Sequence, residues 1–401
     1  MNPFFDQLGR KVRERWQQEN FSLEAFPEIA TTAIDESPPS GAVDLEEMIH
    51  EFLINEEQPF QSESGFGQPE LIAYNHPRFY IQILFWLEGT TDVHQHEFSG
   101  AFHVMSGSSI HAEYEFEKEQ VVTPYLSVGD LRMKQIELLE TGRTVPITSG
   151  RGCIHSLFHL DTPSVTVVVR THNDPGTGPQ YNYLPPHLAV DPIQVGSDTL
   201  TMRRKQLLGV LESLGDPNYA TRVSEMVASL DFERGFSILL HAMDYLQEFG
   251  EWETVLGVFE EKHGDLAKGV AKTLEESSRR DVITRMRGYI EDPEHRFFLA
   301  LLMNVPNRLE IYSLISKRFA NPPRVVLQWL GELIEPTDFG IAILDATFPE
   351  TLDLPAQEQA DMLMATLEHF LDGSGAVDEL SEEQSEIYGA LKASSLGVLF
   401  D

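Results

Sequence analysis

The amino-acid sequence predicts an α+β protein in which N-terminal helices precede an antiparallel β-barrel or sandwich and an all-α region follows it. Up to about residue 190, short β-rich runs alternate with clusters of Gly, Pro and Asp, which is typical of antiparallel sheets. After about residue 196, apolar residues recur with the 3.6-residue period of helices. We therefore expect two domains, residues 1–195 and 196–401.

The composition of the 401-residue chain is that of a folded protein, with 41 % hydrophobic and 23 % charged residues. A net charge of -35 disfavours phosphate-rich partners, so we expect no binding to nucleic acid or to anionic membranes. The single cysteine, Cys153, excludes an internal disulfide and suits a reducing compartment. Residues 1–18 suggest an amphipathic helix rather than a signal peptide, and no run approaches the roughly 20 apolar residues of a membrane span. We expect a cytoplasmic protein.

The first half of the chain is expected to be helical over much of residues 1–60, most clearly at DLEEMIHEFL, residues 44–53. Five β-rich runs then follow, at residues 78–89, 100–116, 121–139, 144–160 and 164–172. A segment rich in Pro and Gly, residues 172–192, closes this half.

The second half carries apolar stripes at helical spacing but no chemistry that the sequence alone reveals. Several helices are expected to start at an Asx-Pro pair, because the Asx side chain can cap the first turn and proline loses no needed donor there. These pairs are Asp216-Pro217, Asp292-Pro293 and Asn321-Pro322. Their unequal intervals indicate no repeat. A protein partner or a homo-oligomer contact is the role left open for this region.

Three histidines on the β-rich runs form a candidate metal site. Residues i and i+2 of a strand share a face, so His94 and His96 point the same way. His155 lies on a later run, and if the two strands are neighbours the three imidazoles converge. Imidazole suits Fe, Zn, Cu and Ni, and three ligands leave positions open. The alternative is that these are surface histidines of a barrel.

The segments around these histidines resemble the metal-binding motifs of the cupin superfamily. EGTTDVHQH followed by GAFHVMSG is similar to the first cupin motif, and GRGCIH has the Gly-x-x-His ending of the second. Most cupins also carry a glutamate seven residues before the closing glycine of the first motif, where this chain has Gly100. That glycine is typical of the cysteine dioxygenase-like thiol dioxygenases, and it stands where the mammalian enzymes have their cross-linked cysteine. The resemblance covers about residues 70–190.

The resemblance implies a double-stranded β-helix barrel in which His94, His96 and His155 bind Fe(II), with Zn or Ni as the alternative metals. It implies an oxygenase that adds both atoms of O₂ to the sulfur of a small thiol. The alternative from another class is a metal-binding cupin without redox turnover, which acts as a sensor or scaffold while its helical domain binds a protein partner.

The match to thiol dioxygenases fails at two places. The family's Tyr-x-Arg carboxylate clamp is incomplete, since Tyr74 is present but no arginine follows it at the expected place. The Ser-His-Tyr group of the last strand is replaced by Thr166, Val168 and Arg170. If that face points inward, Arg170 could hold a carboxylate bidentately, so the substrate would be an acid but not necessarily cysteine. The alternative is that Arg170 reaches solvent.

Tyr74, Thr166 and Arg170 are therefore the candidate substrate-binding residues. Cys153 and His159 share the face of His155 by strand parity, so they are candidates for contacts around the ligands. By the same parity, His103 is expected to face outward as a surface or interface residue, and His111 is expected on a solvated face.

Overall fold

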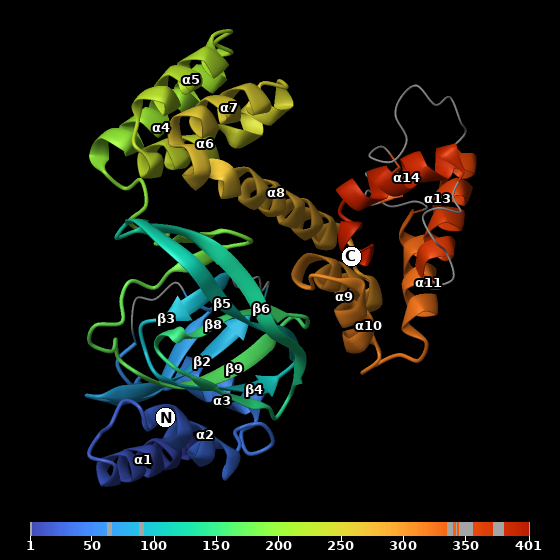
Figure 1. Ribbon diagram of the computed structural model, residues 1–401. Helices are drawn as coiled ribbons and strands as arrows, with labels where there is room; N and C mark the ends of the chain where they lie inside the picture. Colours follow the sequence, from blue (N-terminus) through green and yellow to red (C-terminus); the bar gives the residue numbers. More distant parts are fainter. Residues whose placement is uncertain are drawn as a thin grey trace. The chain divides into compact units, whose positions relative to one another are not determined.

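The computed structural model describes residues 2–61, 66–87, 92–334, 340–341, 343–344, 356–371 and 381–400 (Figure 1). The chain forms two compact units. The first comprises residues 1–135 and 139–277, and the second comprises residues 136–138 and 278–401. The first unit thus holds the β-rich half together with the helices that follow it directly. The domain boundary expected after residue 195 stays a prediction.

Three N-terminal helices open the first unit: α1 (Pro3–Gln18), α2 (Phe26–Asp35) and α3 (Leu45–Ile54). The side chain of Asn2 accepts a hydrogen bond from the Phe4 backbone N–H and proline occupies the first helical position, which is a favoured way to begin a helix. Asp44 caps α3 in the same way. The apolar stripe of α1 is buried, at Phe5, Leu8, Val12 and Trp16.

Two antiparallel sheets follow. The strand order in the five-stranded sheet is β1 (Glu70–His76), β2 (Phe79–Trp86), β9 (Ser164–Thr171), β4 (Gly100–Ser106) and β7 (Thr144–Ile147). The other sheet closes into a barrel in the order β10 (Asn182–Leu184), β11 (Leu188–Val190), β6 (Leu126–Glu140), β5 (Ser108–Thr123), β8 (Gly150–His159) and β3 (Val93–His96).

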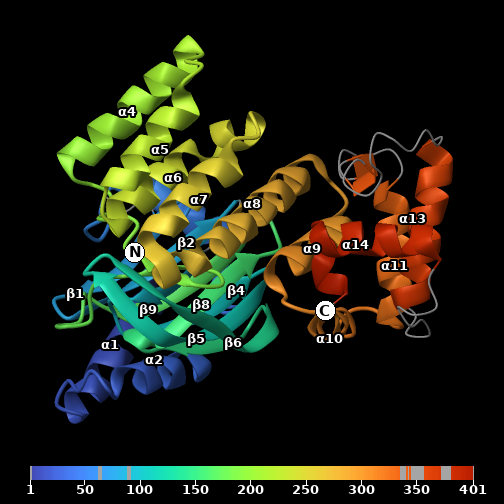
Figure 2. The ribbon, with the colours of Figure 1, turned by 45° about the horizontal axis from the view of Figure 1, so that its top comes forward.

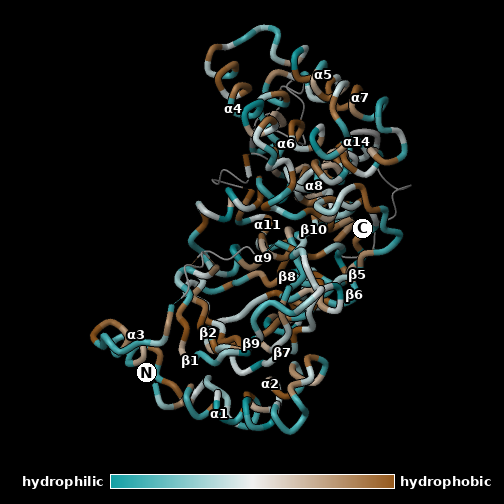
Figure 3. The backbone as a smooth tube through the Cα atoms, turned by 90° about the vertical axis from the view of Figure 1, so that its left-hand side faces the viewer, coloured by the Kyte–Doolittle hydropathy of each residue, from teal (hydrophilic) through white to brown (hydrophobic). Residues whose placement is uncertain are grey.

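The central strands of the five-stranded sheet, β2, β9 and β4, are buried on both faces. On one face, Ile81, Val167 and Val169 pack with the N-terminal helices, which lie against this sheet (Figure 2). On the other face, Leu84 and Val168 join a second apolar cluster inside the β-structure. Burial on both faces explains why β2 and β9 are almost continuously apolar, as the hydropathy colouring of β2 illustrates (Figure 3).

The helices that complete the first unit are α4 (Thr199–Leu214), α5 (Tyr219–Ser229), α6 (Phe232–Glu248), α7 (Trp252–His263) and the short η1 (Gly264–Ala267). Their shared core includes Leu126, Leu188 and Val190 of the barrel. The long helix α8 (Lys268–Tyr289) runs from this unit into the next. The helix start expected at Asp216-Pro217 is wrong by two residues, because Asp216 accepts from the Asn218 backbone N–H in a turn and α5 begins at Tyr219.

The second unit is helical: α9 (Pro293–Asn304), α10 (Arg308–Ile315), α11 (Pro322–Ile334), α13 (Ala356–Leu371), α14 (Glu382–Ala393) and η3 (Gly397–Leu399). The other two Asx-Pro starts are confirmed, since α9 begins at Pro293 with Asp292 as its cap and α11 begins at Pro322. None of the described helices is both long and apolar enough to cross a lipid bilayer. The predicted order of N-terminal helices, an antiparallel β-barrel and a helical region is confirmed.

Candidate metal centre

Two neighbouring barrel strands bring the three predicted histidines together. His94 and His96 lie on β3 and share a face, and His94 stands opposite His155 of β8 in the strand register. One potential ligand atom from each imidazole lies within 4.8 Å of the others. The three side chains are buried, with 5 %, 5 % and 3 % of their surface exposed, so bulk solvent hardly reaches their ring nitrogens.

The hydrogen bonds of the histidines prepare their Nε2 atoms for a metal. The Nδ1–H of His94 donates to the Asp92 carbonyl at 2.7 Å, which leaves a lone pair on Nε2, and that Nε2 has no hydrogen-bond partner. The Nε2 atoms of His96 and His155 are 2.9 Å apart. A buried nitrogen without a partner beside two close nitrogens fits a divalent ion bound by three imidazoles.

Burial lowers the pKa of His94, and it lowers the pKa of His96 and of His155 well below the usual value for histidine. The neighbouring histidines contribute in the same direction at His96 and His155. The imidazoles are therefore neutral near pH 7, which is the form that binds metals.

Close approach of the β9 backbone explains why residue 100 is a glycine. A Cβ atom at Gly100 would lie 2.1 Å from the Val169 carbonyl oxygen and 2.9 Å from the Cα of Arg170. Strand β9 passes so close to β4 that no side chain fits at this position. The donor set is therefore three neutral imidazoles without a carboxylate from residue 100.

The histidines face a cavity in which the centre of a water molecule can occupy a volume of about 40 Å³. That is room for two or three water-sized groups. Its described lining contains no charged side chain and is mostly apolar: Phe66, Gln82, Leu84, Trp86, His94, His96, Phe98, Phe102, Ile147, His155, Leu157, Thr166 and Val168.

Two polar side chains of the five-stranded sheet share this lining. Thr166, a predicted substrate-binding residue, lies in the cavity wall, where its hydroxyl accepts a 3.1 Å hydrogen bond from Trp86 Nε1. Gln82 was not predicted; it is 1 % exposed and its Oε1 has no hydrogen-bond partner. One feature of the sequence could have indicated Gln82: it is a lone amide inside an otherwise apolar strand.

Arg170 lies on the same strand face as Thr166 and Val168, but it is not among the described residues that line the cavity. Its guanidinium stacks on the ring of Phe98, with Cζ 3.4 Å from the ring centroid, and lies 5.1 Å from that of Tyr80. Its Nε donates to the Thr171 carbonyl. Burial lowers the pKa of Arg170, and its charge contributes to lowering the pKa of His96. The cation is thus near the centre, with the ring of Phe98 as its main contact.

The contacts of the other three candidates, Tyr74, His159 and Cys153, differ. Tyr74 packs on the opposite face of the five-stranded sheet, where its ring contacts Phe79. The ring also lies so close to Gly9 of α1 that no side chain would fit at that residue. The fold therefore does not bring Tyr74 to the histidines. His159 stacks on the cavity residue Trp86, with ring centroids 4.6 Å apart. Cys153 is partly buried, and burial raises the pKa of its thiol to about 12.

Two expectations about surface histidines are wrong. His111 is 1 % exposed, and its Nε2 lies 3.0 Å from Nδ1 of His155. His103 is fully buried and forms hydrogen bonds with Thr144 Oγ1 and Ser40 Oγ. His103 does face away from the barrel interior, on the side of Ala101 and Met105, but the N-terminal segment covers it, and β5 is buried on both faces where His111 lies.

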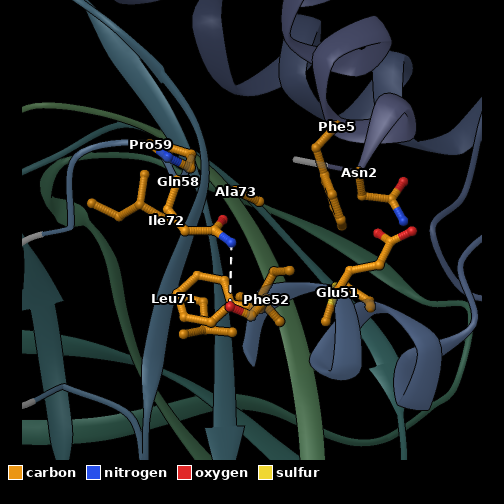
Figure 4. A pocket seen from close by; sticks show the side chains of 11 residues that line it. Asn2, Phe5, Glu51, Phe52, Gln58, Pro59, Leu71, Ile72 and Ala73 are labelled. Carbon is orange, nitrogen blue, oxygen red and sulfur yellow. Dashed lines mark hydrogen bonds between the residues drawn. The ribbon is translucent and has the colours of Figure 1, made fainter. Parts of the chain in front are cut away.

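A second cavity, of about 30 Å³, lies between the N-terminal helices and β1 (Figure 4). Phe5 of α1 and Phe52 of α3 line it together with Leu71 and Ile72, and Gln58 donates a hydrogen bond to the Phe52 carbonyl. Its described lining contains no histidine or cysteine. The candidate metal chemistry therefore belongs to the histidine cavity.

Fold and site together define an antiparallel β-barrel with a candidate three-histidine metal centre. No family model and no curated protein matches the chain. Among solved structures, it is similar to hydroquinone 1,2-dioxygenase from Sphingomonas sp. TTNP3 with 4-hydroxybenzoate bound (10 % identity, 28 % of this chain and 70 % of that chain, TM-score 0.22). It is also similar to KdgF from Halomonas sp. (18 % identity, 29 % and 91 %, TM-score 0.20). A third similar structure is DMSP lyase DddQ from Ruegeria pomeroyi (14 % identity, 44 % and 95 %, TM-score 0.24).

Proposed function

We propose that this protein is a non-haem Fe(II)-dependent oxygenase that adds O₂ to the sulfur of a small thiol. The observation that supports the proposal is the convergence of three buried, neutral imidazoles on one point, with the Nε2 of His94 left without a partner. His94, His96 and His155 would hold the ion.

The donor set favours an anionic co-ligand. Three neutral ligands leave the full 2+ charge of a divalent ion uncompensated, and a thiolate is the form of a thiol that binds metals. Iron, when bound, would supply the reactivity towards O₂ that zinc lacks. The absence of a carboxylate ligand at Gly100 follows from the backbone contact with Val169.

The protein's own residues would shape the cavity and exclude water. The rings of Phe98 and Phe102 and the side chain of Leu157 surround the histidines with apolar surface. The hydrogen bond from Trp86 to Thr166 fixes the opposite wall. A dry, rigid pocket strengthens electrostatic interactions with the substrate and limits the poses it can adopt.

The cavity favours a smaller and less charged substrate than an amino acid or another acid. No charged side chain is present in its described lining, so a carboxylate at the end of the ligand remote from the metal would be desolvated without a charged side chain in contact. Arg170 stacks on Phe98, so we propose that it orients this ring and does not clamp a carboxylate.

The alternative function is a metal-binding cupin without turnover whose helical region binds a partner. One observation favours it: helix α4 exposes apolar side chains seven residues apart, with Leu200 58 %, Leu207 63 % and Leu214 74 % exposed. Such a stripe is typical of helix pairing with a second chain.

Metal analysis and oxygen consumption distinguish the two functions. The full-length protein is purified without a metal-binding tag, its metals are quantified, and O₂ uptake is followed after anaerobic loading with Fe(II) and addition of a series of thiols. Thiol-dependent O₂ uptake by the iron form supports the oxygenase. Tightly bound zinc with no uptake for any thiol would contradict it and favour the binding module.

A further inference from the structure

Gln82 is a polar side chain in the cavity wall whose buried oxygen has no hydrogen-bond donor among the described residues, so packing alone does not explain why a glutamine occupies this position. It lies on β2 opposite Val168 of β9, and both side chains line the cavity. Its neighbours on the same face of β2 are the apolar Leu84 and Trp86. Within the described residues its Oε1 is buried and accepts no hydrogen bond. A buried acceptor without a donor destabilises the folded chain, so an amide retained here indicates a partner that enters the cavity.

The position of Gln82 relative to the metal centre suggests what it binds. Gln82 belongs to the five-stranded sheet, whereas the histidines belong to the barrel sheet that contributes the rest of the lining. Thr166 is its diagonal neighbour across the β2–β9 pair, since Leu84 stands opposite Thr166. A small molecule held at the histidines would therefore reach these polar groups with its other end.

The chemistry of the cavity restricts that other end to an uncharged hydrogen-bond donor. The atom of Gln82 that is fully buried without a partner is the acceptor Oε1, and a carboxylate cannot donate a hydrogen bond to it. An ammonium group would be repelled by a divalent ion at the histidines, and no acidic side chain is present in the described lining. A hydroxyl or an amide N–H carries no such penalty.

We propose that Gln82 is a specificity-determining residue that selects a small ligand with a metal-binding sulfur at one end and a hydroxyl or amide N–H at the other. The inference rests on the proposed metal and thiol function and specifies the substrate class of the same site. Gln82 would orient the ligand by one hydrogen bond to its Oε1.

The test is calorimetric binding to the full-length protein loaded with redox-inert Zn(II), with 2-mercaptoethanol and 1-propanethiol as probes. The two probes differ by a hydroxyl in place of a methyl group. We expect the wild-type protein to bind 2-mercaptoethanol about ten-fold more tightly. Gln82→Met should abolish this preference. Ile83→Met, on the same strand but the opposite face, should retain it.

A second readout uses the metal-free protein. Because Gln82→Met removes a buried acceptor without a partner, we expect its thermal unfolding midpoint to rise above that of the wild type. A preference for 2-mercaptoethanol that survives Gln82→Met would overturn the inference and leave the proposed function intact. Failure of both thiols to bind any metal-loaded form would overturn the proposed function together with the inference.

Discussion

The Nε2 atom of His111 lies 3.0 Å from the Nδ1 atom of His155, and both rings are buried. This contact fixes the tautomer of His155 if its Nδ1–H donates to His111, because the lone pair then remains on Nε2, the atom that faces His96. His111, on the neighbouring strand β5, is thus a positioning residue for a metal ligand.

Replacement of His111 should weaken metal binding without removing a ligand. We expect His111→Phe to lower the affinity for Zn(II) or Co(II) about 10- to 100-fold, the usual effect of losing a partner behind a ligating histidine. His111→Gln should retain part of the affinity, since an amide oxygen can accept the same N–H. Competition with a coloured chelator measures both. Equal affinities for the wild type and His111→Phe would show that the contact does not support the site.

The backbone contact at Gly100 makes a prediction about stability. Gly100→Ala places a Cβ 2.1 Å from the Val169 carbonyl oxygen, so β4 and β9 must separate. We expect the free energy of unfolding in urea to fall by about 1–3 kcal/mol. The control is Gly209→Ala in the middle of α4, where nothing lies within 4 Å of the new Cβ. That change should stabilise the protein by up to about 1 kcal/mol. An unchanged free energy of unfolding for Gly100→Ala would contradict the close contact between β4 and β9.

The lowered pKa of the buried His103 predicts that the protein loses stability on mild acidification. Burial lowers its pKa to about 4 in the folded protein, partly opposed by Asp35, against about 6.5 for an unperturbed histidine. At a pH between these two pKa values, His103 is protonated in the unfolded chain but not in the folded chain. The contribution of His103 to stability is therefore complete above the upper pKa and is lost as the pH falls towards the lower pKa. Urea unfolding of the metal-free protein from about pH 7.5 to about pH 5.5 should show a smaller decline for His103→Gln than for the wild type. Equal losses of stability with falling pH in the wild type and in His103→Gln would exclude His103 as a cause of the acid sensitivity.

Arg170 tests whether the site recognises acids. Loss of the cation stacked on Phe98 should lower the free energy of unfolding of Arg170→Met by about 1 kcal/mol. Its affinity for uncharged thiols, measured on the Zn(II) form, should change by less than about two-fold. A selective loss of binding for a carboxylate-bearing thiol such as mercaptoacetate would instead favour Arg170 as a carboxylate clamp.

The sequence predicted the three histidines because strand parity is a local property. His94 and His96 share a face wherever their strand lies, and their spacing to Gly100 and His155 resembles the cupin motifs. The fold class followed from the change in apolar period, which each segment carries by itself.

The surroundings of the ligands could not be predicted in the same way. His111 shares a strand face with Glu113 and Glu115, which indicated solvent, but β5 begins buried on both faces and becomes exposed only further along. Gln82 is one polar residue on a strand whose partner β9 lies about 80 residues later in the chain. Which side chains meet across sheets depends on register and closure, which the sequence of one strand does not determine.

The central claim is that His94, His96 and His155 hold one transition-metal ion, and metal analysis of the purified full-length protein tests it most directly. The account predicts one ion per chain, with iron as the metal that supports O₂ uptake, and near-complete loss of the ion when His155 is replaced by alanine while the exposed-histidine control His172→Ala retains it. A folded wild-type chain that binds no transition metal, or a His155→Ala chain that keeps its full metal content, would contradict it.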